Sequence, residues 1–496
     1  MAKKIEDIIV IGGSASGLAA ALALSNQGYR VRVFEKDGGP LPTTRVEAFE
    51  DWDRKGAPQV RTSHGFIARL RNLLKNEFPG LYQELLDEGA YDTSMADLWP
   101  PTIEDTSPQP GDEEVCMLAC RRITFDWVLR RHVERNPLVT VEAGCACVGL
   151  LAEDDAATGL KRVTGVRIRR EDGSEEEHRA DLVVDASGRR TGLDEWLEGA
   201  GAPRPRQESE HCGYFICSRF YKMRPGMEEP PDARGFNAVD LGYMAALLVR
   251  GDSGIFSIML ATPRDDAEFK QLVKPERFDA AVKAIPLFAP WIEEGRADPI
   301  TDVRGFGQVM NTRRYFLDER GEPIVLGFVA VGDTAMHTNP AYGRGVTQSF
   351  LYAQLLAQAV AGSGGDLREL SLNLERRVEE ELGPWYQHAL KTDRQTRAAR
   401  ERQAKRKAEP QSTQVDPDEF MRSVMSEGVG VAMRTDPVVF RAGMRVYNML
   451  ALPKTMQGDP ELMKRVMKVW QERENRAPQV NGPERDQMLE ILRRAA

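Results

Sequence analysis

Residues 8–36, IIVIGGSASGLAAALALSNQGYRVRVFEK, decide the fold, because they have the pattern of a strand, a glycine-rich turn, a helix and a second strand. The β-branched run Ile8–Ile11 is typical of a buried parallel strand. The spacing Gly12-x-Ser14-x-x-Gly17 matches the dinucleotide fingerprint, with a small serine in place of the middle glycine. The stretch therefore predicts an α/β unit that binds a dinucleotide.

The flanking elements support this interpretation. The helix expected at 18–27 is rich in Ala and Leu, and its N-terminus offers free N–H groups and a positive dipole end to a diphosphate. The strand expected at 30–34 ends in Glu35, about twenty residues past the glycines, where a carboxylate accepts ribose hydroxyls and disfavours a 2′-phosphate. The alternative is a turn that serves packing alone.

Composition excludes several classes of protein. The 496 residues include 67 Lys plus Arg against 76 Asp plus Glu, a net charge of -9, so no overall basic field favours nucleic acid. No apolar run approaches the length of a membrane span, and the N-terminus lacks the features of a secretory signal. The six cysteines do not have the spacing of a disulfide framework or a zinc site. We expect a cytoplasmic protein without a metal site or an integral membrane segment.

Two later stretches have turn chemistry of the same kind. The apolar run 182–184 predicts a strand beside the first one, and the sequence Asp-Ala-Ser-Gly at 185–188 predicts a tight turn at its carboxyl end. The stretch GDTAMHTNPAYGRG at 332–345 precedes a helix expected at 346–361. Ligands of open α/β sheets bind at the carboxyl ends of strands. There Asp333 can accept hydrogen bonds from a polyol, and Gly343 and Gly345 leave room for a flat ring against the backbone.

Other candidate features have two interpretations each. The basic residues Arg45, Arg61 and His64 follow the first unit and could reach the diphosphate from the side opposite the glycine-rich turn, or belong to a solvated loop. Residues 91–114 are rich in Pro and acidic residues and predict a loop or lid. Strands expected at 213–224 and 245–262 contain aromatic and Met side chains that could wall an apolar pocket or serve sheet packing alone.

The three motifs, in this order, resemble FAD-dependent monooxygenases of the para-hydroxybenzoate hydroxylase fold. Within that superfamily the sequence is most similar to the flavin-dependent olefin epoxidase branch, which includes polyether-pathway epoxidases and, more distantly, styrene monooxygenase. The similarity extends to about residue 395, and three segments carry it: HGFIARLRNLLKNEFPGLYQELLDEGA (64–90), VVDASGRRTGLDEWLEGAGAP (183–203) and NPAYGRGVTQSF (339–350). The tail segment DPVVFRAGMRVYNML (436–450) is similar too.

The resemblance implies a fold class and a division of the chain. The class is α/β, with a Rossmann-like FAD-binding domain of the GR2 type, an interleaved antiparallel-sheet substrate domain and a helical C-terminal region. The FAD-binding domain would comprise residues 1–190 and 300–365 and include an inserted helix and loop region at 60–115. The substrate domain would span 191–299, and a helical cap would span 366–496.

The motifs and the resemblance together define a set of candidate FAD-binding residues. Arg122 would contact the cofactor, Asp333 would bind the ribityl and diphosphate region, and the helix N-terminus at 343–346 would lie near the N1–C2=O edge of the flavin. His337 is a weak candidate for an acid or base, the alternative being a structural partner in its turn. The full set is Gly12, Gly13, Ser14, Ser16, Gly17, Glu35, Lys36, Arg45, Arg122, Asp185, Gly332, Asp333, Pro340, Gly343, Gly345 and Val346.

The resemblance also implies a reaction. One oxygen atom from O2 would be inserted, through a flavin C4a-hydroperoxide, into a lipophilic small molecule by alkene epoxidation or hydroxylation. NAD(P)H would be the ultimate electron donor. Single-component hydroxylases have Asp-Gly followed by an Arg involved in using the nicotinamide where this chain has Asp185-Ala-Ser-Gly188, so reduction by a separate flavin reductase is an open alternative.

Three other functions stay open at this point. One is an FAD-dependent dehydrogenase or reductase acting on an isoprenoid-like or other apolar substrate. Another is a flavin halogenase, although the WxWxIP signature is absent and no lysine is marked for the halogenating role. The last is a non-catalytic flavin-binding protein.

Overall fold

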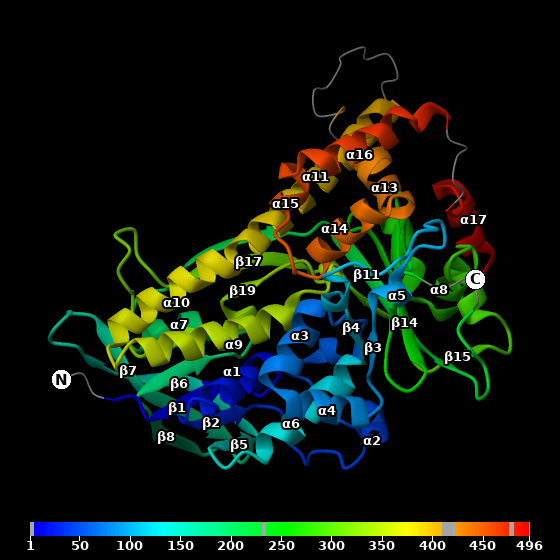
Figure 1. Cartoon of the computed structure of the whole chain (residues 1–496). Helices are drawn as coiled ribbons and strands as arrows, with labels where there is room; N and C mark the ends of the chain where they lie inside the picture. The colour runs from blue at the N-terminus through cyan, green and yellow to red at the C-terminus, as the bar shows by residue number, and fades with distance from the viewer. Residues whose placement is uncertain (1–3, 231–234, 409–419, 421–422, 476–480, 496) are drawn as a thin grey trace.

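The fold is built on a parallel sheet with the strand order β18-β9-β1-β2-β5, of which β1, β2 and β5 are labelled in Figure 1. The computed structural model describes residues 4–230, 235–408, 420, 423–475 and 481–495. The strands of this sheet are β1 (Asp7–Ile11), β2 (Arg30–Glu35), β5 (Val139–Ala143), β9 (Leu182–Asp185) and β18 (Phe328–Ala330). The Rossmann-like core predicted from the sequence is confirmed.

Strand β1 lies between β2 and β9, and Val10 is opposite Val33 on one side and Val184 on the other. All three valines are fully buried. The helix α1 (Ala15–Ser25) and the antiparallel strands β6 (Cys145–Asp154) and β7 (Lys161–Arg170) pack against this sheet, so water is excluded from it, which explains the continuous β-branched runs.

Helices cover the sheet, and α1 (Ala15–Ser25) lies side by side with α9 (Gly345–Gly362) (Figure 1). The hydroxyls of Ser16 and Ser349 are 2.8 Å apart at this contact. A Cβ on Gly332 would be 2.3 Å from Oγ of Ser16, so only glycine fits there. Other helices of this part of the chain are α2 (Arg45–Glu50), α3 (Ala68–Glu77), α4 (Pro79–Asp87), α6 (Arg122–Glu134) and α7 (Leu193–Gly199).

A second, antiparallel sheet has the order β12-β13-β14-β11-β15, and β16 also pairs with β11. It has its own apolar core, which it shares with α8 (Pro275–Lys283) and with α17 (Arg485–Arg494) at the far end of the chain. The strands are β11 (Tyr214–Met223), β12 (Ala238–Asp240), β13 (Ala245–Arg250), β14 (Ile255–Pro263), β15 (Ala297–Pro299) and β16 (Arg304–Phe306).

Smaller antiparallel units complete the β structure. The sequence predicts a ribbon turned at Asp172-Gly173, and β7 and β8 meet at this turn. The strands of these units are β3 (Tyr91–Thr93), β4 (Met117–Ala119), β6 (Cys145–Asp154), β7 (Lys161–Arg170), β8 (Glu175–Arg179), β10 (Arg206–His211), β17 (Met310–Tyr315) and β19 (Met336–His337).

After α9 the chain is helical apart from its connections. The long helix α11 projects beyond the sheets (Figure 1), and among the later helices α13, α14 and α16 pack against one another. Asp436 and Asp459 begin α14 and α16 by accepting hydrogen bonds from backbone N–H groups of the first turn, with proline at the first helical position. The helices are α10 (Leu367–Glu381), α11 (Gly383–Ala408), α13 (Gly430–Thr435), α14 (Pro437–Tyr447), α15 (Lys454–Gly458) and α16 (Pro460–Gln471).

The segment 91–114 differs from the predicted loop. Its first residues form β3, which pairs with β4, and Met95–Leu98 form the short helix α5 with a capping box at Ser94. The sequence does not predict this pairing, because β3 is only three residues long and its partner β4 follows the loop. No helix in the described part of the chain combines the length and apolarity needed to cross a membrane.

Candidate flavin site and the cavity beside it

The glycine-rich turn lies directly against the Asp-Ala-Ser-Gly turn. Gly12 has a φ of +102°, and a Cβ there would be 2.7 Å from the carbonyl oxygen of Ala186. A Cβ on Gly17 would be 1.8 Å from the carbonyl oxygen of Gly12. Both positions therefore require glycine, because another part of the backbone lies too close for a Cβ atom. The contact of Gly12 with Ala186 brings the two motifs together at one edge of the parallel sheet.

A cavity of about 190 Å³ opens at this edge. Four residues of the predicted set line it, namely Gly12, Ser14, Glu35 and Lys36. The carboxylate of Glu35 accepts hydrogen bonds from the backbone N–H groups of Gly13 at 2.7 Å and Asp37 at 2.9 Å. The glycine-rich turn and the acid at the end of β2 thus form a single wall. Residues that the sequence did not indicate also line the cavity, among them Arg54, Ser187, Arg190 and Trp196.

The wall of this cavity fits a nucleotide diphosphate. Nε of Arg54 and Oγ of Ser187 are buried and have no hydrogen-bond partner among the described residues. The N-terminus of α1 is not capped by a side chain, because Ser14 instead donates its hydroxyl to Asp126 at 2.9 Å. A diphosphate accepts hydrogen bonds from free N–H groups and from a guanidinium, and the positive end of a helix dipole attracts its charge.

Arg54, rather than Arg45, is the arginine that the fold places at the glycine-rich turn. Nη2 of Arg54 lies 3.4 Å from both Glu35 and the carbonyl oxygen of Gly13, and Nη1 lies 3.6 Å from Asp37. Arg45 donates to the carbonyl oxygen of Glu88 at the end of α4. Local sequence does not distinguish these two arginines, because Arg45 begins the short helix α2 and Arg54 lies in the loop after it, and distant contacts set where each side chain lies.

Arg122 belongs to a buried network that reaches the same turn. Its guanidinium pairs with Asp126 one helical turn later, at 2.5 and 3.2 Å, and Asp126 is the residue that accepts from Ser14. Nη1 of Arg122 also faces Nε2 of His64 at 3.5 Å, while Nδ1 of His64 donates to the carbonyl oxygen of Thr62. Burial and the neighbouring Arg122 charge lower the pKa of His64 to about 4, so its imidazole is neutral at pH 7.

Asp185 and His337 each accept or donate hydrogen bonds within the turn to which they belong. Asp185 is fully buried and accepts hydrogen bonds from the backbone N–H of Ser187 and the hydroxyl of Thr191. Nδ1 of His337 donates to the carbonyl oxygen of Asp333 at 3.0 Å, and burial lowers the pKa of this histidine. Both contacts favour structural roles. The Asp333 carboxylate is partly exposed and lies 3.6 Å from Nε of Arg189.

The third motif forms a loop that leads into α9. Asn339 caps its first turn by accepting from the N–H of Ala341, and Gly343 adopts a φ of +67° before the helix begins at Gly345. The N-terminus of α9 has no side-chain cap, so the first N–H groups of this helix are left for another partner, and the neighbouring Val346 is buried. The loop and this helix end therefore offer a second site for partial negative charge.

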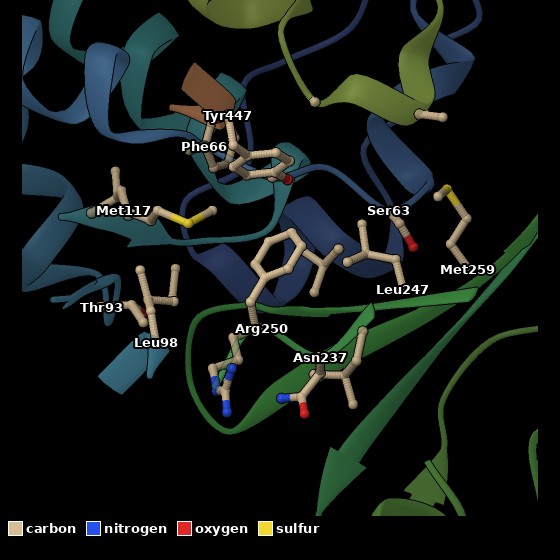
Figure 2. A pocket seen from close by; sticks show the side chains of 18 of the residues that line it. Ser63, Phe66, Thr93, Leu98, Met117, Asn237, Leu247, Arg250, Met259 and Tyr447 are labelled. Atoms are coloured by element: carbon tan, nitrogen blue, oxygen red, sulfur yellow. The ribbon is translucent and has the colours of Figure 1, made fainter. Parts of the chain in front are cut away.

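A second cavity, of about 70 Å³, touches this loop (Figure 2). Pro340, Ala341 and Gly343 contribute to its wall. The antiparallel sheet and the inserted region supply most of the remaining lining, with Tyr447 coming from the C-terminal helices. The lining side chains are mainly apolar and include Phe66, Leu98, Met117, Leu118, Phe236, Leu247, Val249 and Met259, with Ser63, Thr93, Asn237 and Arg250 as polar neighbours.

Comparison with known families agrees with this geometry. Residues 7–192 match the family described as FAD dependent oxidoreductase, and this range contains the glycine-rich turn and the Asp-Ala-Ser-Gly turn. Protein Rv3254 of Mycobacterium tuberculosis is 26% identical over 405 residues, which cover 77% of this chain and 79% of that protein.

Solved flavoenzymes share the fold. The myxobacterial chondrochloren halogenase CndH has a TM-score of 0.58 at 18% identity, covering 97% of this chain and 99% of its own. A triple mutant of the flavin-dependent brominase Bmp2 has a TM-score of 0.59 at 14% identity, covering 95% and 100%. PqsL of Pseudomonas aeruginosa, described as a probable FAD-dependent monooxygenase, has a TM-score of 0.52 at 15% identity, covering 78% and 94%.

The family match and the site support an FAD-dependent oxidoreductase. FAD is the cofactor that both favour, and the residues at the cavity edge would hold its ADP part. The comparisons do not separate the epoxidase branch from other flavin oxidoreductases. Within the described residues, no group of three or more His, Cys, Asp or Glu side chains is arranged to hold a metal ion.

Proposed function

We propose that this chain is an FAD-dependent monooxygenase that transfers one oxygen atom from O2 to a lipophilic small molecule, by alkene epoxidation or hydroxylation. The observation that supports this most directly is the apolar cavity against residues 340–343. Reduced flavin, when bound, supplies the activated oxygen. In the balanced reaction, substrate, O2, NAD(P)H and one proton yield the oxygenated product, water and NAD(P)+.

The residues of the cavity wall bind and shield rather than donate protons. Among the described residues that line it, none is Asp, Glu, His or Lys. Its one charged residue, Arg250, is paired with Glu229 through hydrogen bonds of 2.9 to 3.0 Å. An alkene needs no general base for oxygen transfer, whereas a phenol usually does. The lining therefore favours epoxidation over phenol hydroxylation.

Exclusion of water is the second property that the proposal needs. Apolar side chains from several elements surround the cavity, so a bound substrate replaces water at the place where the oxygen is transferred. The uncapped N-terminus of α9 would stabilise negative charge at the edge of the flavin through its oriented N–H groups.

The electron source is part of the proposal. NAD(P)H would reduce the flavin directly or through a separate flavin reductase. Stopped-flow mixing of the FAD-loaded protein with NADH or NADPH distinguishes these routes, because direct use reduces the flavin within turnover time without any added protein.

Oxygen chemistry tests the proposal before a substrate is known. The FAD-loaded protein is reduced chemically and mixed with oxygenated buffer while flavin absorbance is followed. A monooxygenase is expected to reoxidise in two phases, the first dependent on O2 concentration and the second independent of it. With styrene as an alkene probe and ¹⁸O2, the epoxide is expected to gain one ¹⁸O atom, and none from H2¹⁸O.

A dehydrogenase or reductase acting on an isoprenoid-like or other apolar substrate is the alternative reaction for the same cavity. It predicts reoxidation in a single phase and no oxygen in the product. The halogenation named for two structural neighbours is less favoured, because no described residue lining the cavity is a lysine and the chain lacks the WxWxIP signature.

A further inference from the structure

A phenolic hydroxyl from the C-terminal helices faces the apolar cavity. Tyr447, the last residue of α14, lines the cavity together with Gly343. In Figure 2 its ring lies on the side of the cavity opposite Asn237 and Arg250. Its ring meets Phe236 edge to face, with the centroids 4.7 Å apart. No described residue hydrogen-bonds its hydroxyl. Burial raises the pKa of Tyr447 to about 12, so the phenol stays protonated and is a donor at neutral pH.

The neighbouring residue anchors this tyrosine. Asn448 is fully buried, and its Oδ1 accepts the backbone N–H of Ala68 at 2.8 Å, which is the first residue of α3. Its carbonyl oxygen accepts the N–H of Arg69. Asn448 thereby caps the N-terminus of α3 across 380 residues of chain, next to the cavity residue Phe66.

A second contact holds α14 against the segment that carries other cavity residues. Arg441 pairs with Asp112 at 2.9 Å and Arg445 with Glu114 at 2.7 Å. These acids precede Met117 and Leu118 of β4, which line the cavity. These ion pairs tie the helix that carries Tyr447 to the segment before β4.

We infer that Tyr447 is a specificity-determining residue that donates a hydrogen bond to an oxygen acceptor on the substrate. The substrate class is an apolar molecule with an ether, carbonyl or hydroxyl oxygen near the end that lies by Gly343. A donor that the bound substrate shields from water selects against an analogue that lacks the acceptor, because the hydroxyl is then left without a partner. The inference rests on the proposed function for taking this cavity as the substrate site.

A matched pair of probes tests the inference by binding alone. 4-Methylanisole and 4-ethyltoluene are similar in size and differ by an ether oxygen in place of a methylene. Calorimetric titration of the FAD-loaded wild type is expected to show 4-methylanisole binding about three- to tenfold more tightly, the range of one net hydrogen bond. In Tyr447→Phe the preference is expected to vanish, because 4-methylanisole no longer gains a hydrogen bond and 4-ethyltoluene no longer leaves a hydroxyl without a partner.

Tyr243→Phe is the control, because its hydroxyl donates to the carbonyl oxygen of Pro483 and it does not line this cavity. It is expected to keep the wild-type preference. FAD content and melting temperature verify that each variant is folded. A preference that survives in Tyr447→Phe overturns the inference, as does equal binding of both probes to the wild type or no binding of either. These results leave the O2 test of the proposed function unaffected, so the two can fail separately.

Discussion

Nδ2 of Asn339 donates a 2.9 Å hydrogen bond to the carboxylate of Asp393 and so ties the loop before α9 to helix α11, 54 residues further along the chain. The same carboxylate accepts from Nδ2 of Asn311 at 2.7 Å and from the hydroxyl of Tyr342 at 2.7 Å. Asp393 is buried. A helix of the C-terminal region thereby supports the loop predicted to lie against the flavin.

Asp393→Asn tests whether this support matters for the cofactor. The amide has the same shape but turns an NH2 group toward three donors, so at least one buried donor loses its partner, at a cost of about 1–3 kcal/mol. We expect a lower melting temperature and a dissociation constant for FAD about tenfold higher, measured by flavin fluorescence quenching on the apoprotein. Asp459→Asn, at the N-cap of α16, is the control. A similar loss of FAD affinity in both variants would contradict a specific role.

A pair of arginines tests the placement of the diphosphate. Arg54→Lys keeps the charge but removes the planar fork that faces Glu35 and Gly13, so the dissociation constant for FAD should rise at least about tenfold. Arg45→Lys should leave it within about twofold, because Arg45 donates to the carbonyl oxygen of Glu88. Equilibrium titration of the two apoproteins with FAD gives both values, and the reverse order would place the diphosphate beside Arg45.

Gly345→Ala tests whether FAD contacts the backbone at this position, apart from any effect of the substitution on stability. A Cβ at this position meets no heavy atom within 4 Å, so the protein without FAD should be as stable as wild type or gain at most about 1 kcal/mol. If a flat ring lies against this backbone, FAD binding weakens by an order of magnitude. Gly362→Ala, at the other end of the same helix with equal space, is the control and should change neither value. Unchanged FAD affinity in Gly345→Ala would exclude the contact.

The buried pair of Arg121 and Asp252 predicts a dependence of stability on pH. Burial alone would raise the pKa of Asp252, but the hydrogen bonds and charge of Arg121 bring it below 3.8. A lowered folded pKa stabilises the protein above the unfolded value and is lost as the pH falls through the folded one. We expect Asp252→Asn to destabilise at pH 7 by about 3–5 kcal/mol, because Arg121 is left buried without a counter-charge.

The difference in melting temperature between wild type and Asp252→Asn should shrink as the pH is lowered from 5 toward 3. Asp298→Asn serves as the control, because Asp298 pairs with Arg224 on the surface, where solvent screens the charges, and its loss should change the melting temperature little. A difference that stays constant down to pH 3 would show that the charge of Asp252 is not what stabilises the contact.

The sequence by itself determined the elements that depend on neighbours in the chain. The strand at β1, the turn with Gly12 and Gly17, the helix α1 and the acid Glu35 lie within thirty residues, so their spacing can be read along the chain. The strand β9 and the turn at Asp185 form a short segment of the same kind. Periodicity and turn chemistry record such patterns directly, which is why the parallel sheet could be predicted.

Only the tertiary structure decided which distant side chains complete the site. The packing of separate elements places Arg54, rather than Arg45, at the glycine-rich turn. It also places Asp393 against Asn339 and Tyr447 in the wall of the cavity. A polar side chain in a loop or on a helix has the same local pattern whether it faces solvent or a buried partner. Long-range contacts are set by the burial of apolar faces elsewhere, so no local spacing encodes them.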